Sequence, residues 1–159
     1  MIVIADTSPI NYLIRIGSID VLPALYGRVL VPPSVRDELR AASAPEEVKK
    51  WIVDPPAWLV VQAPRHGPDA ALLQAGLDAG ERDAILLAEE LGADELIIDE
   101  LSGRREANQR HLHVIGTLGV LQRAASKGLV DFKQALGRLR ATNFRITQEI
   151  IDRLLEDKG

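Results

Sequence analysis

Two consecutive stretches decide the fold: Gly80-Glu-Arg-Asp-Ala-Ile-Leu-Leu-Ala-Glu-Glu-Leu-Gly92 and Ala93-Asp-Glu-Leu-Ile-Ile-Asp-Glu100. The first carries the apolar run 84–88 and stops at a glycine, which is typical of a buried helix. The second carries the short apolar run 96–98, which is typical of a buried strand. A buried helix that leads directly into a buried strand is the repeating unit of a parallel sheet. These stretches therefore predict an α/β fold.

The same alternation continues on both sides of this unit. The pattern predicts strands at 2–5, 28–31, 58–61, 96–98 and 114–115, and helices at 9–16, 18–26, 33–39, 45–53, 80–91, 118–127, 132–139 and 148–155. Pro32 and Pro33 fit this assignment because proline is tolerated in the first turn of a helix. We expect a single domain over residues 1–159 with a central parallel sheet, in which residues 117–159 form a helical C-terminal third.

The composition excludes several classes of protein. With 159 residues, 47% of them apolar and 26% charged, the chain suits one soluble domain with a core of its own. Because it has no cysteine, it has no disulfide framework, thiolate zinc site or cysteine nucleophile. The first apolar run ends at Asp6 without a preceding basic region, so it predicts a strand and not a signal peptide. No run approaches the roughly 20 apolar residues that cross a bilayer, so we expect a cytoplasmic protein without a membrane partner.

The charge balance bears on nucleic-acid binding. The chain has 19 basic and 23 acidic residues, a net charge of −4. This counts against binding of nucleic acid by overall positive charge, because that requires clustered lysine and arginine. A metal-dependent nuclease remains compatible, since in such an enzyme a cation meets the phosphate and the protein supplies acidic ligands.

Acidic residues gather where the predicted strands end and where helices begin. In an open parallel sheet the site lies outside the carboxyl ends of the strands. The acidic residues near that edge are Asp6, Glu38, Glu81, Asp83, Asp99 and Glu100. Like charges held close together raise one another's pKa, and a divalent cation would relieve this cost. Mg²⁺ and Mn²⁺ prefer oxygen ligands and keep several waters, so two to four carboxylates suffice for a site that hydrolyses a phosphodiester.

Each of these residues also has an ordinary structural explanation. Asp6 could cap the helix that follows it, and Glu38 could lie on a solvated helix face. Glu81 and Asp83 suit the positive end of a helix dipole. Asp99 could belong to a turn, with Glu100 as a helix N-cap. The residue types alone leave both explanations open.

The order of these stretches resembles that of PIN domains, the ribonuclease fold shared by VapC-type toxins of prokaryotic toxin–antitoxin pairs. The resemblance is carried by Ile2-Val-Ile-Ala-Asp-Thr-Ser-Pro9, Val31-Pro-Pro-Ser-Val-Arg-Asp-Glu-Leu39, residues 80–88 and 96–100, Gly103-Arg104, and Val114-Ile-Gly-Thr-Leu-Gly-Val120. The last stretch is similar to a subgroup of uncharacterised prokaryotic PIN-like proteins. The resemblance implies a three-layer α/β/α domain and an endoribonuclease that uses Mg²⁺ or Mn²⁺.

The resemblance also assigns roles by position. Asp6, Glu38 and Asp83 match the first three acidic residues of the family. Asp99 and Glu100 both match the fourth, and Ile98 stands where toxins often have threonine. We expect Asp99 to be the fourth acid, because neighbouring side chains of an extended chain point to opposite faces and Glu100 begins the next helix.

Three further residues are expected to support these acids. Either Thr7 or Ser8 resembles the hydroxyl residue that supports the first acid, although helix capping explains both equally well. Ser8 is expected to support the first acid. Glu81 and Glu100, which lie beside the other expected ligands, are also expected as supporting residues of the site.

The remaining expectations concern partners. Arg104 and Arg105 are expected to contact RNA phosphates, although a solvated helix face explains them equally well. The resemblance implies an RNA substrate and a cognate antitoxin. The apolar faces of the C-terminal helices favour a homodimer.

Two other functions compete with the ribonuclease. A haloacid-type hydrolase or phosphotransferase would need Asp-x-Asp after the first strand, and Asp6-Thr7-Ser8 lacks the second aspartate. The second alternative is a non-catalytic PIN-like module that binds nucleic acid or protein. Such a module has little reason to keep clustered carboxylates, which are costly to the fold.

Overall fold

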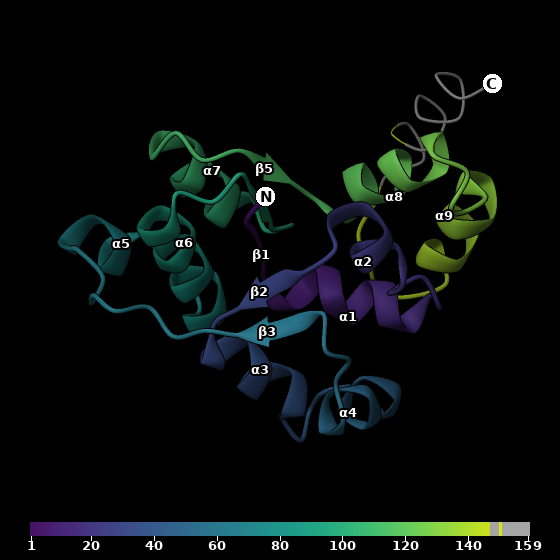
Figure 1. Ribbon diagram of the computed structural model, residues 1–159, viewed down its shortest axis with the longest axis horizontal. Coiled ribbons are helices and arrows are strands. Elements are labelled where there is room, and N and C mark those ends of the chain that lie inside the picture. Colours follow the sequence, from purple (N-terminus) through teal and green to yellow (C-terminus); the bar gives the residue numbers. More distant parts are fainter. Residues whose placement is uncertain (147–149, 151–159) are drawn as a thin grey trace.

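The computed structural model describes residues 1–146 and 150 (Figure 1). Its centre is a five-stranded sheet in the order β3-β2-β1-β4-β5, in which every neighbouring pair is parallel. The strands are β1 Val3–Ala5, β2 Val29–Val31, β3 Leu59–Val61, β4 Glu95–Ile97 and β5 Val114–Ile115. The parallel sheet predicted from the alternating apolar runs is therefore confirmed.

Helices connect the strands. They are α1 Thr7–Arg15, α2 Val21–Tyr26, α3 Pro33–Arg40, α4 Glu46–Val53, α5 Ala70–Gln74, α6 Ala79–Leu91, α7 Leu101–Gln109, α8 Thr117–Ser126 and α9 Phe132–Arg140. The sequence pattern gives no boundaries for α5 or α7. The buried residues of α7 are Gly103 and Ala107, too small to produce an apolar stripe. The predicted helix 148–155 lies outside the described residues.

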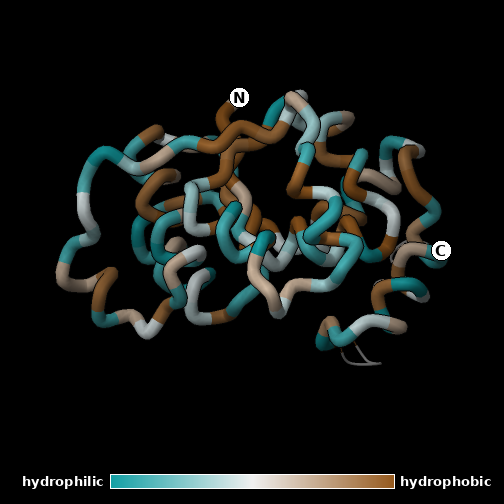
Figure 2. Tube along the Cα trace, turned by 90° about the horizontal axis from the view of Figure 1, so that it is seen from below, coloured by the Kyte–Doolittle hydropathy of each residue, from teal (hydrophilic) through white to brown (hydrophobic). Residues whose placement is uncertain are grey.

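The sheet separates two apolar cores, which makes the three-layer α/β/α architecture. Val3 and Ala5 of β1 face one core, which the helices α1, α2, α3, α4, α8 and α9 cover. Ile4 points to the opposite face and packs with Leu87 of α6 and Ala107 of α7. Both sides of β1 are thus buried, as is usual for the central strand of a parallel sheet. The hydropathy colouring in Figure 2 places apolar segments through the middle of the molecule.

The topology brings the predicted site residues to one edge of the sheet. Because the strands are parallel, β1, β4 and β5 end at the same edge. Asp6 follows β1, residues 98–100 follow β4, and Gly116 follows β5. The backbone N–H of Asp6 donates to the carbonyl of Ile97 at 2.9 Å, which ties the ends of β1 and β4 together. Within the described residues, no helix is long and apolar enough to span a membrane.

Candidate active site

Asp6 is a buried carboxylate at the end of the central strand. Its relative exposure is 4%, and it occupies the N-cap position of α1 without a capping side-chain hydrogen bond. Burial raises its pKa well above the usual value, and the charges of Asp78, Glu81 and Glu38 add to this effect. Its Oδ1 atom has no hydrogen-bond partner among the residues that the structure describes. Helix capping therefore does not account for Asp6, and a buried acceptor without a partner is costly.

Glu38 reaches this carboxylate from α3, where the neighbouring Leu39 is buried in the core. The Thr7 hydroxyl donates to its Oε1 at 2.5 Å, and the Gly80 backbone N–H donates to its Oε2 at 2.8 Å. Burial raises the pKa of Glu38, and these two hydrogen bonds oppose the rise. The Glu38 carboxylate is thereby fixed in position between α1 and α6.

Gly80 leaves the space that the Glu38 carboxylate occupies. A Cβ atom on Gly80 would lie 2.6 Å from Oε1 and 2.7 Å from Oε2 of Glu38. Real Cβ atoms essentially never come within 3.0 Å of such neighbours. A side chain at position 80 would therefore displace the carboxylate.

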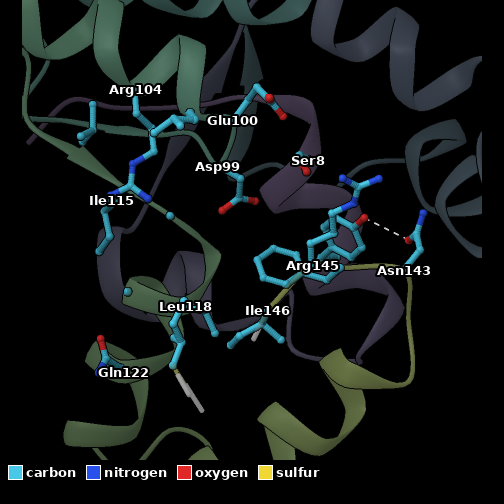
Figure 3. Close-up of a pocket in the computed structure, with 17 residues that line it drawn as sticks. Ser8, Asp99, Glu100, Arg104, Ile115, Leu118, Gln122, Asn143, Arg145 and Ile146 are labelled. Carbon is cyan, nitrogen blue, oxygen red and sulfur yellow. Dashed lines mark hydrogen bonds between the residues drawn. The ribbon is translucent and has the colours of Figure 1, made fainter. Parts of the chain in front are cut away.

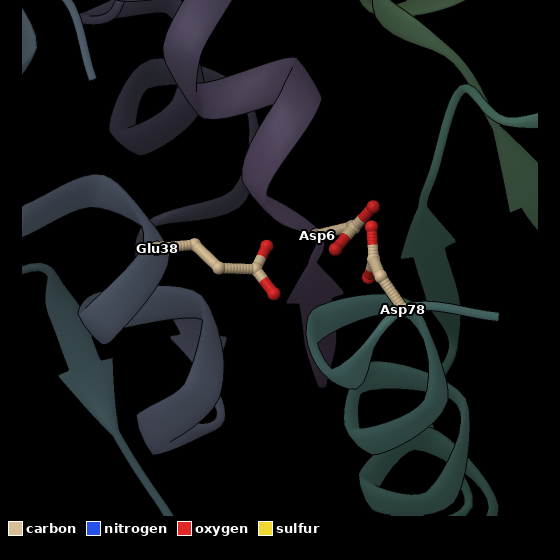
Figure 4. Close-up of side chains that lie close together, drawn as sticks. All are labelled: Asp6, Glu38 and Asp78. Atoms are coloured by element: carbon tan, nitrogen blue, oxygen red, sulfur yellow. The ribbon is translucent and has the colours of Figure 1, made fainter. Parts of the chain in front are cut away.

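Asp78 is the third acid of the cluster, and it is absent from the sequence-based assignment. It is the N-cap of α6 and accepts from the Glu81 backbone N–H at 2.8 Å, while Glu81 Oε1 accepts from the Asp78 backbone N–H at 3.0 Å. Asp6, Glu38 and Asp78 each offer one oxygen, and these atoms lie within 4.8 Å of one another (Figure 4). The capping-box pattern Asp78-Ala-Gly-Glu81 was the sequence signal that could have placed Asp78 at the start of α6.

Two further acids in the first turns of α6, Glu81 and Asp83, affect the charge of this cluster. Glu81 is buried at 6% exposure, and its pKa is raised to about 7, chiefly by burial, with the charges of Asp78 and Glu100 adding to the rise. Asp83 lies further along the helix, 3.0 Å from the Arg82 guanidinium, and its charge raises the pKa of Glu38. The structure therefore brings Asp6 and Glu38 together as expected but places Asp83 outside the set of three oxygens.

Asp99 and Glu100 have different surroundings. Asp99 Oδ1 accepts from the Thr117 backbone N–H and Oδ2 from the Thr117 hydroxyl, both at 2.7 Å. Burial raises the pKa of Asp99, and hydrogen bonds from Thr117 and Ser8 and the charge of Arg104 oppose the rise. Glu100 is exposed, begins α7 without a capping side-chain hydrogen bond, and lines the pocket of the three acids.

Two adjacent pockets lie at this edge of the sheet. The smaller one, about 310 Å³, is lined by Asp6, Thr7, Ser8, Asn11, Tyr12, Glu38, Asp78, Glu81 and Glu100, and we call it the acidic pocket. The larger one, about 680 Å³, shares Ser8, Tyr12 and Glu100 with it and contains Asp99 and Arg104 (Figure 3). Arg105 is exposed and is not among the described lining residues of either pocket.

Comparison with known proteins agrees with this architecture. A family model described as a PIN domain (DUF3368) matches residues 2–159. The chain is structurally similar to a PilT N-terminus domain protein from the hyperthermophilic archaeon Sulfolobus solfataricus P2, with a TM-score of 0.52 and 13% identity over 92% of this chain and 100% of the other. At that identity the likeness concerns the fold alone. No curated protein matches the chain.

Proposed function

The chain belongs to the PIN-domain family DUF3368, and from this membership we propose that it is an endoribonuclease that hydrolyses RNA phosphodiester bonds with Mg²⁺ or Mn²⁺. The observation that carries the proposal is the Oδ1 atom of Asp6. This oxygen is buried, has no hydrogen-bond partner in the described part of the chain, and lies in a group of three carboxylates. A cation in the acidic pocket would supply the missing partner.

The residues of the acidic pocket fit a hard divalent cation. Asp6, Glu38 and Asp78 would hold it through one oxygen each, and water would complete the octahedral shell that Mg²⁺ and Mn²⁺ prefer. Burial is the main cause of the raised pKa values of Asp6 and Glu38, and positive charge there would relieve the repulsion that adds to it. When bound, such a cation polarises the phosphate and lowers the pKa of an attacking water. Asp83, the third acid by family position, would contribute its charge from beside Glu38.

The chain's own residues hold these ligands in place. Thr7 and Gly80 orient the two oxygens of Glu38, and the Glu81 backbone N–H orients Asp78. Partners of this kind fix the direction of metal ligands and strengthen binding. The site is therefore largely formed before a cation enters.

Cleavage of mixed single-stranded RNA tests the proposal. We expect cleavage in Mn²⁺ or Mg²⁺ and none in EDTA. Asp6→Asn should abolish cleavage, and Glu38→Gln should reduce it by roughly 10²-fold or more, the scale of a group that acts in charge stabilisation. The control is Asp37→Asn, which removes an exposed carboxylate next to Glu38 and should leave the rate unchanged.

The outcomes of this experiment also distinguish a ribonuclease from a non-catalytic binding module. RNA that binds but is not cleaved in any divalent cation would identify the chain as a non-catalytic PIN-like module. Cleavage that persists in Asp6→Asn would contradict the assigned site.

The proposal extends to the partners that the resemblance implies. As a toxin, the chain would be inhibited by a cognate antitoxin, and it would act as a homodimer. Loss of RNA cleavage on addition of a candidate antitoxin protein tests the first partner. Light scattering of the purified chain tests the second.

A further inference from the structure

The larger pocket has two chemically different walls. Figure 3 shows the apolar side chains Leu118 and Ile146 on one side and Asp99 and Arg104 on the other. Arg145 enters from a third direction, on the far side of Asp99 from Arg104. The volume of the larger pocket, about 680 Å³, lies within the roughly 300–1,000 Å³ of typical small-ligand sites. Away from the apolar wall the pocket carries two arginines, Arg104 and Arg145, and two carboxylates, Asp99 and Glu100. It therefore fits a ligand with a flat ring whose anionic group lies against the arginines.

Arg104 and Arg145 are available to an anion. Neither guanidinium forms an ion pair with a carboxylate of the described residues, whereas Arg82, Arg110 and Arg123 do. The net charge of the chain is −4, so positive charge at this edge of the sheet must come from local side chains. Arginine presents a planar fork of donors that matches phosphate oxygens.

The segment that carries Arg145 is anchored to α1 by Tyr12. The Tyr12 hydroxyl donates to Asn143 Oδ1 at 3.0 Å, and Arg15 Nη1 donates to the same oxygen at 2.8 Å. Phe144 meets the Tyr12 ring edge to face, with 4.9 Å between the ring centroids. Tyr12 also lines the acidic pocket. The same side chain thus joins the wall of the larger pocket to the candidate cleavage site.

We propose that the larger pocket binds one unpaired nucleotide of single-stranded RNA beside the acidic pocket, with Arg104 and Arg145 on its phosphates and Phe144 against its base. The inference rests on the proposed ribonuclease function, because it places the strand that the acidic pocket would cut. Unstacked bases that lie against aromatic side chains are the usual basis of single-strand recognition. A base in a duplex cannot enter such a pocket without being unpaired, so duplex RNA should bind more weakly.

Binding without cleavage tests the phosphate contacts. The probe is a short fluorescein-labelled single-stranded RNA of mixed sequence, followed by fluorescence anisotropy in EDTA over a range of salt concentrations. Arg104→Ala and Arg145→Ala should each weaken binding about tenfold and each lower the slope of log K against log salt by about one. Arg104→Lys, which keeps the charge, should restore the salt slope.

Two arginines outside the pocket serve as controls. Arg28 is exposed at the start of β2, at the opposite edge of the sheet, and Arg105 neighbours Arg104 on α7 without lining either described pocket. Their alanine variants should weaken binding by about twofold or less, since only general charge is lost. An Arg105→Ala effect equal to that of Arg104→Ala would overturn the proposal.

The base contact has a different signature. Phe144→Leu keeps apolar bulk but removes the ring, so it should weaken binding about tenfold with no change in salt slope. The same variant should bind an abasic probe as the unaltered protein does. Equal affinity of Phe144→Leu and the unaltered protein for the normal probe would overturn the base contact.

This test is independent of the test of the proposed function. If the protein cleaves RNA in Mn²⁺ but the pocket variants bind like the unaltered protein, this inference is wrong and the ribonuclease stands. If the variants behave as expected but no divalent cation supports cleavage, the proposed function fails and the pocket is the RNA site of a non-catalytic module. No binding of single-stranded RNA by the unaltered protein in EDTA overturns the inference outright.

Discussion

At the start of α6, Gly80 affects the Glu38 carboxylate in two ways. Its backbone N–H donates to Glu38, and its missing side chain leaves room for the same carboxylate. Alanine would be a better helix former, worth up to about 1 kcal/mol in a helix interior. Helix propensity and the geometry of the pocket therefore favour opposite residues at this position.

Gly80→Ala should separate these two effects. We expect Mn²⁺ affinity and RNA cleavage to fall at least tenfold, because the new Cβ would lie 2.6 Å from Glu38 Oε1 and displace it. The control is Gly137→Ala in α9, where a Cβ would meet no described atom within 4 Å. That variant should raise the free energy of unfolding by about 0.5–1 kcal/mol without changing metal affinity. Calorimetric titration of Mn²⁺ and denaturant melts measure both, and unchanged metal affinity in Gly80→Ala would contradict the role of Glu38.

Variants of Asp99 and Glu100 should differ both in the free energy of unfolding and in Mn²⁺ affinity. An asparagine at 99 can no longer accept both hydrogen bonds from Thr117, so Asp99→Asn should lower the free energy of unfolding by about 1–3 kcal/mol. Glu100→Gln should leave stability unchanged, because Glu100 is exposed.

For Mn²⁺ affinity, the sequence favoured Asp99, whereas the structure places Glu100 in the acidic pocket. We therefore expect Glu100→Gln to weaken Mn²⁺ binding more than Asp99→Asn does. The opposite ranking in side-by-side titrations would support Asp99, the residue that the sequence favours, as the fourth acid.

At the scale of elements, Asp78 at the N-terminus of α6 combines a helix cap with a proposed metal ligand. Asp78→Ala should lose both, costing about 1 kcal/mol of stability and most of the metal affinity. Asp78→Asn should keep the cap, since asparagine caps helices as well as aspartate does, but should still weaken Mn²⁺ binding by tenfold or more. Thermal melts and Mn²⁺ titrations of the two variants measure each role.

The matched control for Asp78 is Asp131, the N-cap of α9. Its side chain accepts from the Gln134 backbone N–H at 2.8 Å, as Asp78 accepts from Glu81. Asp131→Asn should change neither stability nor metal affinity. Equal metal affinity in Asp78→Asn and Asp131→Asn would exclude Asp78 from the site.

The elements also show what the sequence could and could not predict. The strands and α6 were predictable because their apolar runs are continuous, and Asp6 and Glu38 followed from their positions beside those runs. Helix α7 had no assigned boundaries because its buried residues are glycine and alanine, which leave no apolar period to detect. Asp78 was missed because the helix was predicted to begin at Gly80, which left the capping box of Asp78 and Glu81 out of account, and because its distance from Asp6 depends on how α6 packs against β1.

At the scale of the whole molecule, a cation should stabilise the fold. In the proposed function the folded site binds Mn²⁺ and the unfolded chain has no such site, so Mn²⁺ at a hundred times its Kd would add about 2.7 kcal/mol to the free energy of unfolding. We expect a rise in Tm of several degrees, measured by thermal melting with and without EDTA.

Asp6→Asn should have opposite effects on the Tm in EDTA and in Mn²⁺. In EDTA this variant should melt above the unaltered protein, because it removes a buried acid that the other carboxylates repel. In Mn²⁺ it should melt below it, because the cation then stabilises only the unaltered site. Asp37→Asn should follow the unaltered protein in both buffers. If Asp6→Asn melted above the unaltered protein in both buffers, or below it in both, the result would contradict the metal site.

The pairing of β1 with β4 has a consequence for synthesis. Val3 of β1 lies opposite Glu95 of β4, and the backbone N–H of Asp6 donates to the carbonyl of Ile97. β1 therefore gains β4, its second neighbouring strand, only after more than ninety further residues have been synthesised. Such distant pairing is slow to form and comes after local helices. A nascent chain shorter than this length would carry Asp6 without its pocket, so the RNA cleavage proposed above would begin only after β4 has been made.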